Sequence, residues 1–83
     1  MKLQHILLKV NVVKILGDKN KEITNINFNS KKITKNGLFV AIRGLVADGH
    51  DYIDNSIKSG ASVIFAEILP KKIHKDITYI CVK

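Results

Sequence analysis

The sequence is poor in cysteine, proline and tryptophan, with one Cys, one Pro and no Trp among its 83 residues. Cys81 cannot form an internal disulfide and has no cysteine or histidine partner at metal-binding spacing, so a disulfide scaffold and a zinc module are both excluded. No apolar run approaches the roughly 20 residues that span a membrane, and the first eight residues include no small-residue cleavage site. We therefore expect a cytoplasmic protein with no membrane partner.

Motifs that bind nucleotide phosphates or metals are also missing. The sequence has neither a Gly-x-x-x-x-Gly-Lys-Ser/Thr loop nor a Gly-x-Gly-x-x-Gly turn. His5, His50 and His74 fall in different predicted elements, which argues against a shared metal site. Asp48 and Asp51 could serve acid-base chemistry, but we expect structural roles for them, Asp51 as a helix N-cap and Asp48 as a turn former. We expect no metal and no cofactor in this chain.

Basic residues outnumber acidic residues by fourteen to seven, and the formal net charge of +7 raises the question of a nucleic-acid partner. All the basic residues except Arg43 are lysine, whereas base readout and bidentate phosphate contacts favour arginine. A small nucleic-acid-binding module is therefore the weaker alternative, and we expect no nucleic-acid partner. A stacking platform is not expected either, because most of the aromatic residues fall at predicted core positions of strands or helices: Phe28, Phe39, Tyr52, Phe65 and Tyr79.

What the sequence does contain is the pattern of one α/β domain, since a chain of 9.3 kDa has room for a single core. Apolar spacing predicts a helix over 3–10, neighbouring strands over 12–16 and 23–28, a strand over 38–42 at the sheet centre, a helix from Asp51 to Gly60, and strands over 61–66 and 77–82. We expect a small mixed sheet of about four to five strands with flanking helices and a βαβ unit over 38–66. A chain that stops at a strand is expected to be a piece of a longer protein.

Two loops are candidates for ligand binding, because ligands of open α/β sheets bind outside the carboxyl ends of the strands. Strand 23–28 leads into Asn29-Ser30-Lys31, and strand 38–42 leads into residues 43–49. If these strands are parallel, the Ser30 hydroxyl would lie on the same rim as the apolar tripeptide 45–47, an arrangement that suits a planar heterocycle. The alternative is that Ser30 merely terminates a strand and that the tripeptide folds back on the core.

A known pattern matches these positions at the same spacing throughout. The matching segments are Asn29-Ser30-Lys31, Lys35-Asn36-Gly37-Leu38-Phe39-Val40-Ala41, Gly44, Asp48-Gly49-His50-Asp51-Tyr52-Ile53, Gly60-Ala61 and Glu67. In these segments the chain resembles the amino-terminal domain of the Mur ligases, ATP-dependent enzymes that extend the stem peptide of peptidoglycan in the bacterial cytoplasm. The family usually has Asp-Ser-Arg where this chain has Asn29-Ser30-Lys31.

The resemblance is nearest to the tripeptide synthetase (MurE), and the ligase that adds D-alanyl-D-alanine (MurF) is the alternative. It implies that residues 1–83 are the amino-terminal domain of a three-domain enzyme and bind the uridine diphosphate part of UDP-N-acetylmuramoyl-L-alanyl-D-glutamate. ATP, magnesium and the catalytic residues would then belong to the central and carboxyl-terminal domains of the parent enzyme, which adds meso-diaminopimelate or lysine. This fragment alone would be inactive.

The resemblance also implies a substrate-binding role for five residues. By position, Ser30 would hydrogen-bond the uracil or its diphosphate side, and Phe28 would line the same pocket. Leu45, Val46 and Ala47 would form the other wall. The central ATP-binding domain of the same chain would be the remaining partner.

Overall fold

The apolar segments of the sequence form the strands of one mixed sheet. The computed structural model describes residues 1–43 and 48–83. The strands within these ranges are β1 (Val12–Leu16), β2 (Ile26–Asn27), β3 (Gly37–Val40), β4 (Ala61–Ala66) and β5 (Thr78–Val82). Their order across the sheet is β1-β5-β4-β3-β2, with β1 antiparallel to β5 and the other neighbours parallel. The predicted mixed sheet is confirmed.

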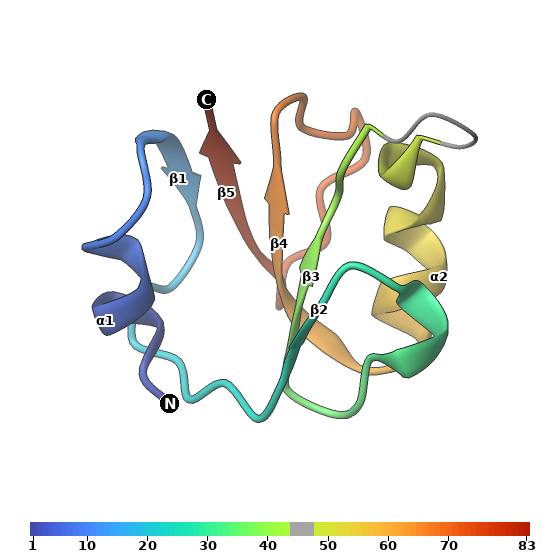
Figure 1. Ribbon diagram of the computed structural model, residues 1–83, viewed down its shortest axis with the longest axis horizontal. Helices are drawn as coiled ribbons and strands as arrows, with labels where there is room; N and C mark the ends of the chain where they lie inside the picture. The colour runs from blue at the N-terminus through green and yellow to red at the C-terminus, as the bar shows by residue number, and fades with distance from the viewer. Residues whose placement is uncertain (44–47) are drawn as a thin grey trace.

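Two short helices cover opposite faces of this sheet. α1 (Leu3–Leu7) lies on one face and α2 (Ile53–Lys58) on the other, which gives the three layers seen in Figure 1. Two 3-10 helices, η1 (Ser30–Lys32) and η2 (Gly49–Tyr52), lie in the connections that follow β2 and β3. The succession of β3, α2 and the parallel strand β4 confirms the predicted βαβ unit. No helix in the described ranges has the length and apolar character needed to cross a bilayer.

The sheet has a core on each face because its inner strands are apolar on both sides. On the α2 face the fully buried hydrophobic side chains are Phe39, Ile64, Ala66 and Tyr79. On the α1 face the fully buried side chains are Leu3, Leu38, Val63 and Ile80. α1 therefore caps one side of the sheet, as its apolar spacing predicts, although the helix ends at Leu7 and not at residue 10.

The strand order differs from the sequence prediction in two ways. β1 and β2 are not neighbours but occupy opposite edges, and β4, not β3, is the central strand. The physical reason is burial: β1 and β2 both carry exposed side chains, whereas every residue of β4 except Ser62 is buried. A strand that is apolar on both faces is best covered in the middle of a sheet, while partly polar strands tolerate an edge.

The helical segment after β3 begins earlier than predicted. Asp51 is not its N-cap but lies inside η2, and Asp48 takes the capping role by accepting a hydrogen bond from the His50 N–H at 3.0 Å. The cause is the 3-10 turn that precedes α2, which moves the uncapped N–H groups toward the N-terminus. At the other end Gly60 follows the helix with a φ of +117°, the left-handed conformation of a C′ glycine, as predicted.

Candidate functional site

A hollow of about 340 Å³ lies beside the carboxyl end of β2. Its lining residues are Phe28, Asn29, Ser30, Lys31 and Tyr52. Because β2 and β3 are parallel, the connections that follow them leave the sheet at the same edge, which is the condition for a shared site. The structure thus brings the predicted residues Ser30 and Phe28 together in one depression, and it adds Tyr52 from the connection after β3.

Local hydrogen bonds fix the position of Ser30. The Asn27 side chain accepts a hydrogen bond from the Asn29 N–H at 2.9 Å, and the Asn29 side chain accepts one from the Lys31 N–H at 3.0 Å. Asn29 is therefore the N-cap of η1, a role in which an amide oxygen serves as well as a carboxylate. Ser30 is the first residue of η1, is only 6% exposed and forms part of the buried wall of the hollow.

The two aromatic residues of the hollow are exposed, which contradicts the core positions predicted for them. Phe28 is 70% exposed because β2 ends at Asn27, one residue before it. Tyr52 is 41% exposed because it closes η2 and precedes α2, so it lies outside the buried stripe of that helix. The other three aromatic residues, Phe39, Phe65 and Tyr79, are buried as predicted.

The connection after β3 is held at its base by backbone contacts. Arg43 and Asp48 form an isolated antiparallel bridge, and the Gly49 N–H donates to the Ile42 carbonyl at 2.6 Å. Gly49 is required there, because a Cβ at this position would lie 2.5 Å from the Ile42 nitrogen. The predicted site residues Leu45, Val46 and Ala47 lie outside the described residues.

His50 links this connection to the one that follows β4. Its Nδ1 lies 2.7 Å from Asp48 Oδ1, and its Nε2 accepts a hydrogen bond from the Ile68 N–H at 3.3 Å. Since an accepting ring nitrogen carries no proton, this arrangement uses the neutral ring with its proton on Nδ1, pointing at the carboxylate. The hydrogen bond from the His50 backbone N–H, followed by that from the His50 ring, lowers the pKa of Asp48 below its ordinary value. Asp48 and His50 therefore act as structural groups.

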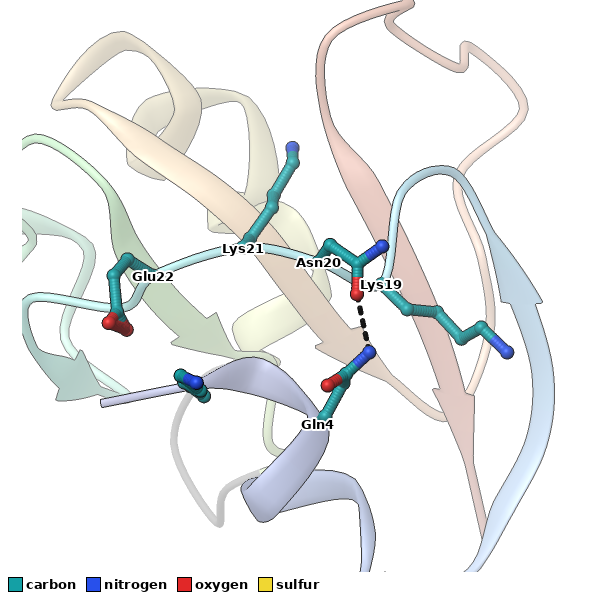
Figure 2. Close-up of a pocket in the computed structure, with 6 residues that line it drawn as sticks. Gln4, Lys19, Asn20, Lys21 and Glu22 are labelled. Carbon is teal, nitrogen blue, oxygen red and sulfur yellow. Dashed lines mark hydrogen bonds between the residues drawn. The ribbon is translucent and has the colours of Figure 1, made fainter.

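A second hollow, of about 240 Å³, lies between α1 and the chain leading to β2 (Figure 2). Its lining is largely basic and amide in character: Lys2, Gln4, Lys19, Asn20, Lys21 and Glu22. Gln4 donates to Asn20 across it, while the Lys21 ammonium turns away and donates to the carbonyls of Ser62 at 3.0 Å and Asp76 at 2.7 Å. Burial lowers the pKa of Lys21. The polar side chains of Gln4, Asn20 and Lys21 therefore hydrogen-bond to other segments of the chain and do not point together into the hollow.

Residues 1–43 and 48–83 form no metal-binding cluster. No three histidine, cysteine, aspartate or glutamate side chains gather there in a way that could hold a metal ion. The hollow beside β2 combines the hydroxyl group of Ser30, the aromatic rings of Phe28 and Tyr52, and the basic side chain of Lys31.

Relatives of known activity match most of this chain. It is 45% identical over 73 residues to UDP-N-acetylmuramoyl-L-alanyl-D-glutamate–2,6-diaminopimelate ligase 1 of Clostridium acetobutylicum, covering 88% of this chain and 15% of that protein. It is 40% identical over 80 residues to the corresponding ligase of Phocaeicola vulgatus, covering 96% of this chain and 16% of that protein. The chain thus spans about a sixth of the length of these curated relatives.

A solved structure shows the same fold. The UDP-N-acetylmuramoylalanyl-D-glutamyl-2,6-diaminopimelate–D-alanyl-D-alanyl ligase of Acinetobacter baumannii superimposes with a TM-score of 0.75 over 98% of this chain and 18% of that protein, at 18% sequence identity. At that identity the likeness concerns the fold alone, and it confirms the predicted α/β class.

The family model that matches is described as the Mur ligase family, catalytic domain, and it covers residues 22–81. Those residues contain no Gly-x-x-x-x-Gly-Lys-Ser/Thr loop, so the match does not bring a nucleotide phosphate cradle with it. The match nevertheless spans well over half of the chain and includes η1, η2 and the whole hollow beside β2. Together with the identities to the two diaminopimelate ligases, it shows that this chain belongs to the Mur ligase family.

Proposed function

We propose that this chain is the amino-terminal domain of a MurE-type ligase and that the hollow beside β2 binds the uridine end of UDP-N-acetylmuramoyl-L-alanyl-D-glutamate. The observation that carries the proposal is the convergence of Ser30 and Phe28 on one hollow at the carboxyl edge of the sheet. Ligands of open α/β sheets bind at that edge. The two diaminopimelate ligases among the relatives, whose names specify this UDP-linked substrate, support the same assignment.

Each residue has a distinct role in the proposed site. The Ser30 hydroxyl hydrogen-bonds a polar group of the uracil or of its diphosphate side, and the exposed Phe28 ring supplies apolar contact. Leu45, Val46 and Ala47, to which the family resemblance assigns the other part of this site, lie outside the described residues. The excess of basic over acidic residues favours the approach of a substrate that carries a diphosphate.

The reaction itself belongs to the parent enzyme. In that proposal, ATP bound with magnesium by a central domain phosphorylates the terminal side-chain carboxylate of the glutamate residue. The amino group of a diamino acid then displaces phosphate to form the new amide bond. This chain contributes to the reaction by positioning the substrate, because holding the uridine end fixes where the peptide end can lie.

The D-alanyl-D-alanine-adding ligase shares the fold and is the alternative assignment for this chain. The identity to two diaminopimelate ligases favours the MurE assignment.

The direct test is a nuclear magnetic resonance titration of the ¹⁵N-labelled chain with UDP. We expect changes in amide chemical shift concentrated at residues 28–31 and 52, with a dissociation constant of about 1 mM, because UDP lacks many of the contacts that the whole substrate makes.

Ser30→Ala should weaken UDP binding by about 1–3 kcal/mol, since it removes one hydrogen bond to a partly buried ligand group. It should leave the melting temperature nearly unchanged.

Ser62→Ala is the matched control. Ser62 lies near the amino end of β4, and its buried hydroxyl has no hydrogen-bond partner among the described residues, so its loss should change neither binding nor stability greatly. If UDP shifts no amides near the hollow, or if Ser30→Ala binds UDP as well as Ser62→Ala does, the proposed site is wrong.

A further inference from the structure

Tyr52 lines the hollow although the family resemblance assigns it no role. It comes from η2, whereas the other lining residues belong to the connection after β2, so the hollow is formed by two separate segments of the chain. Its ring is 41% exposed, and Phe28 on the other segment is 70% exposed. The exposed aromatic residues in the described ranges are these two, and both line the same hollow.

The surroundings of the Tyr52 ring differ from those of the aromatic rings in the core. Neither of the two hydrophobic cores includes it. Tyr79 shows what a structural tyrosine does in this protein, since its ring is fully buried and its hydroxyl accepts a hydrogen bond from the His74 N–H at 3.1 Å. Aromatic rings held at the surface around a depression are typical of sites that bind planar ligands.

The backbone that carries Tyr52 is held firmly in place. Asp48 caps the start of η2, the Gly49 N–H is bonded to the Ile42 carbonyl, and α2 follows Tyr52 directly. His50 adds a link to Ile68 beyond β4. Because this backbone is already ordered, a ligand does not have to order it on binding, which favours affinity.

We infer that Tyr52 is a ligand-binding residue whose ring packs against the pyrimidine base of a nucleoside diphosphate, as a second aromatic wall beside Phe28. This inference rests on the proposed function and extends it to a residue outside the Ser30 loop. The volume of about 340 Å³ lies in the range of about 300–1,000 Å³ that small-molecule sites occupy. Lys31, which also lines the hollow, provides the positive charge that a diphosphate requires.

The test compares Tyr52→Leu with Tyr52→Phe in UDP titrations of the chain. Stacking of a base needs the aromatic ring but not its hydroxyl group. Tyr52→Leu should therefore weaken UDP binding by about five- to a hundredfold. Tyr52→Phe should bind UDP as tightly as the unaltered chain does. The uracil H5 and H6 signals should move upfield on binding to the unaltered chain, and Tyr52→Leu should reduce this ring-current shift. A merely structural role would not change that spectroscopic signature.

Two controls separate base stacking from general damage. Ile73→Ala shortens an apolar side chain that is 45% exposed and lies outside the hollow, so it should leave UDP binding unchanged. Inorganic pyrophosphate carries the same diphosphate without a base, and its binding should be equal in Tyr52→Leu and in the unaltered chain.

The outcomes distinguish this inference from the proposed function. If the unaltered chain binds UDP and Tyr52→Leu binds it equally well with the same uracil shifts, the inference is overturned and the Ser30 site stands. If the unaltered chain shows no UDP binding at about 10 mM, where a dissociation constant near 1 mM gives almost full occupancy, both are overturned.

Discussion

Asp48 accepts two hydrogen bonds from a single neighbour, the backbone N–H and the ring of His50. These bonds favour the ionised carboxylate and lower its pKa below the ordinary value of 3.8. A carboxylate whose pKa is lower in the folded than in the unfolded chain stabilises the fold at pH values above the ordinary value. This contribution is lost as the pH falls through the lower, folded pKa.

We therefore expect Asp48→Asn to be less stable than the unaltered chain at pH 7, and the difference to shrink below about pH 4. The asparagine keeps an oxygen that can accept the His50 N–H but cannot carry the charge. Urea unfolding of both proteins at several pH values between 7 and 3 measures this difference directly, and other carboxylates that titrate in the same range cancel in the comparison.

Asp51→Asn serves as the control for that measurement. Asp51 lies inside η2 and is not the residue whose side chain caps it, so its amide variant should leave the stability nearly unchanged at every pH. An equal loss of stability at pH 7 and pH 3 in Asp48→Asn, or a larger effect at Asp51, would contradict the capping role of Asp48.

The candidate site shows what residue patterns can and cannot predict. The place of Ser30 beside the hollow could be predicted from the end of a strand and from a matching motif, whereas Phe28 was assigned to it only through the family resemblance. Tyr52 was missed, because a tyrosine next to Ile53 looks like the first turn of an amphipathic helix. Whether that turn is α or 3-10 depends on backbone contacts such as the one between Gly49 and Ile42, which no local pattern encodes.

At the scale of elements, β3 is the strand on which the α2 face of the core depends. Phe39 in β3 is fully buried and packs in the same cluster as Ile53 of α2 and Ile64 of β4. Phe39→Ala should lower the free energy of unfolding by about 3–5 kcal/mol, which is a large part of the stability of a small domain. Denaturant melts measure this loss.

The matched control is Phe28→Ala, which removes the same ring from a position that is 70% exposed. This variant should unfold at nearly the same denaturant concentration as the unaltered chain and should differ from it mainly in UDP binding. A loss of less than about 1 kcal/mol in Phe39→Ala would show that β3 does not belong to the core.

Most elements could be predicted from local patterns, but their arrangement in the sheet could not. The strands over 12–16 and 61–66 match their predictions, because runs of apolar and β-branched residues report local burial. The alternation over 23–28 gives only a short strand, β2, and before it Ile23 and Thr24 donate their N–H groups to carbonyls outside the sheet, those of Met1 and Asn36. Strand order depends on contacts between residues far apart in the sequence, such as Leu16 and Tyr79, and a local pattern contains no record of such contacts.

At the scale of the whole molecule, the chain lacks the loop that Mur ligases would need to hold ATP. Isothermal titration with magnesium-ATP should therefore give no saturable heat, and the chain should release no phosphate from ATP. UDP in the same buffer is the control, because binding through net charge alone would take up both nucleotides. A micromolar dissociation constant for ATP would show that nucleotide chemistry belongs to this chain.

The position of β5 inside the sheet has a consequence for the newly made chain. β1 leaves the ribosome first, but its partner β5 is the last strand in chain order, so β1 stays unpaired until almost the entire domain has emerged. During that interval the central strand β4 also has an open edge, and an apolar strand edge invites pairing with other chains. The insertion of β5 closes both edges at once. Protection from aggregation therefore comes only when the last strand of this domain has been made, and in a single step.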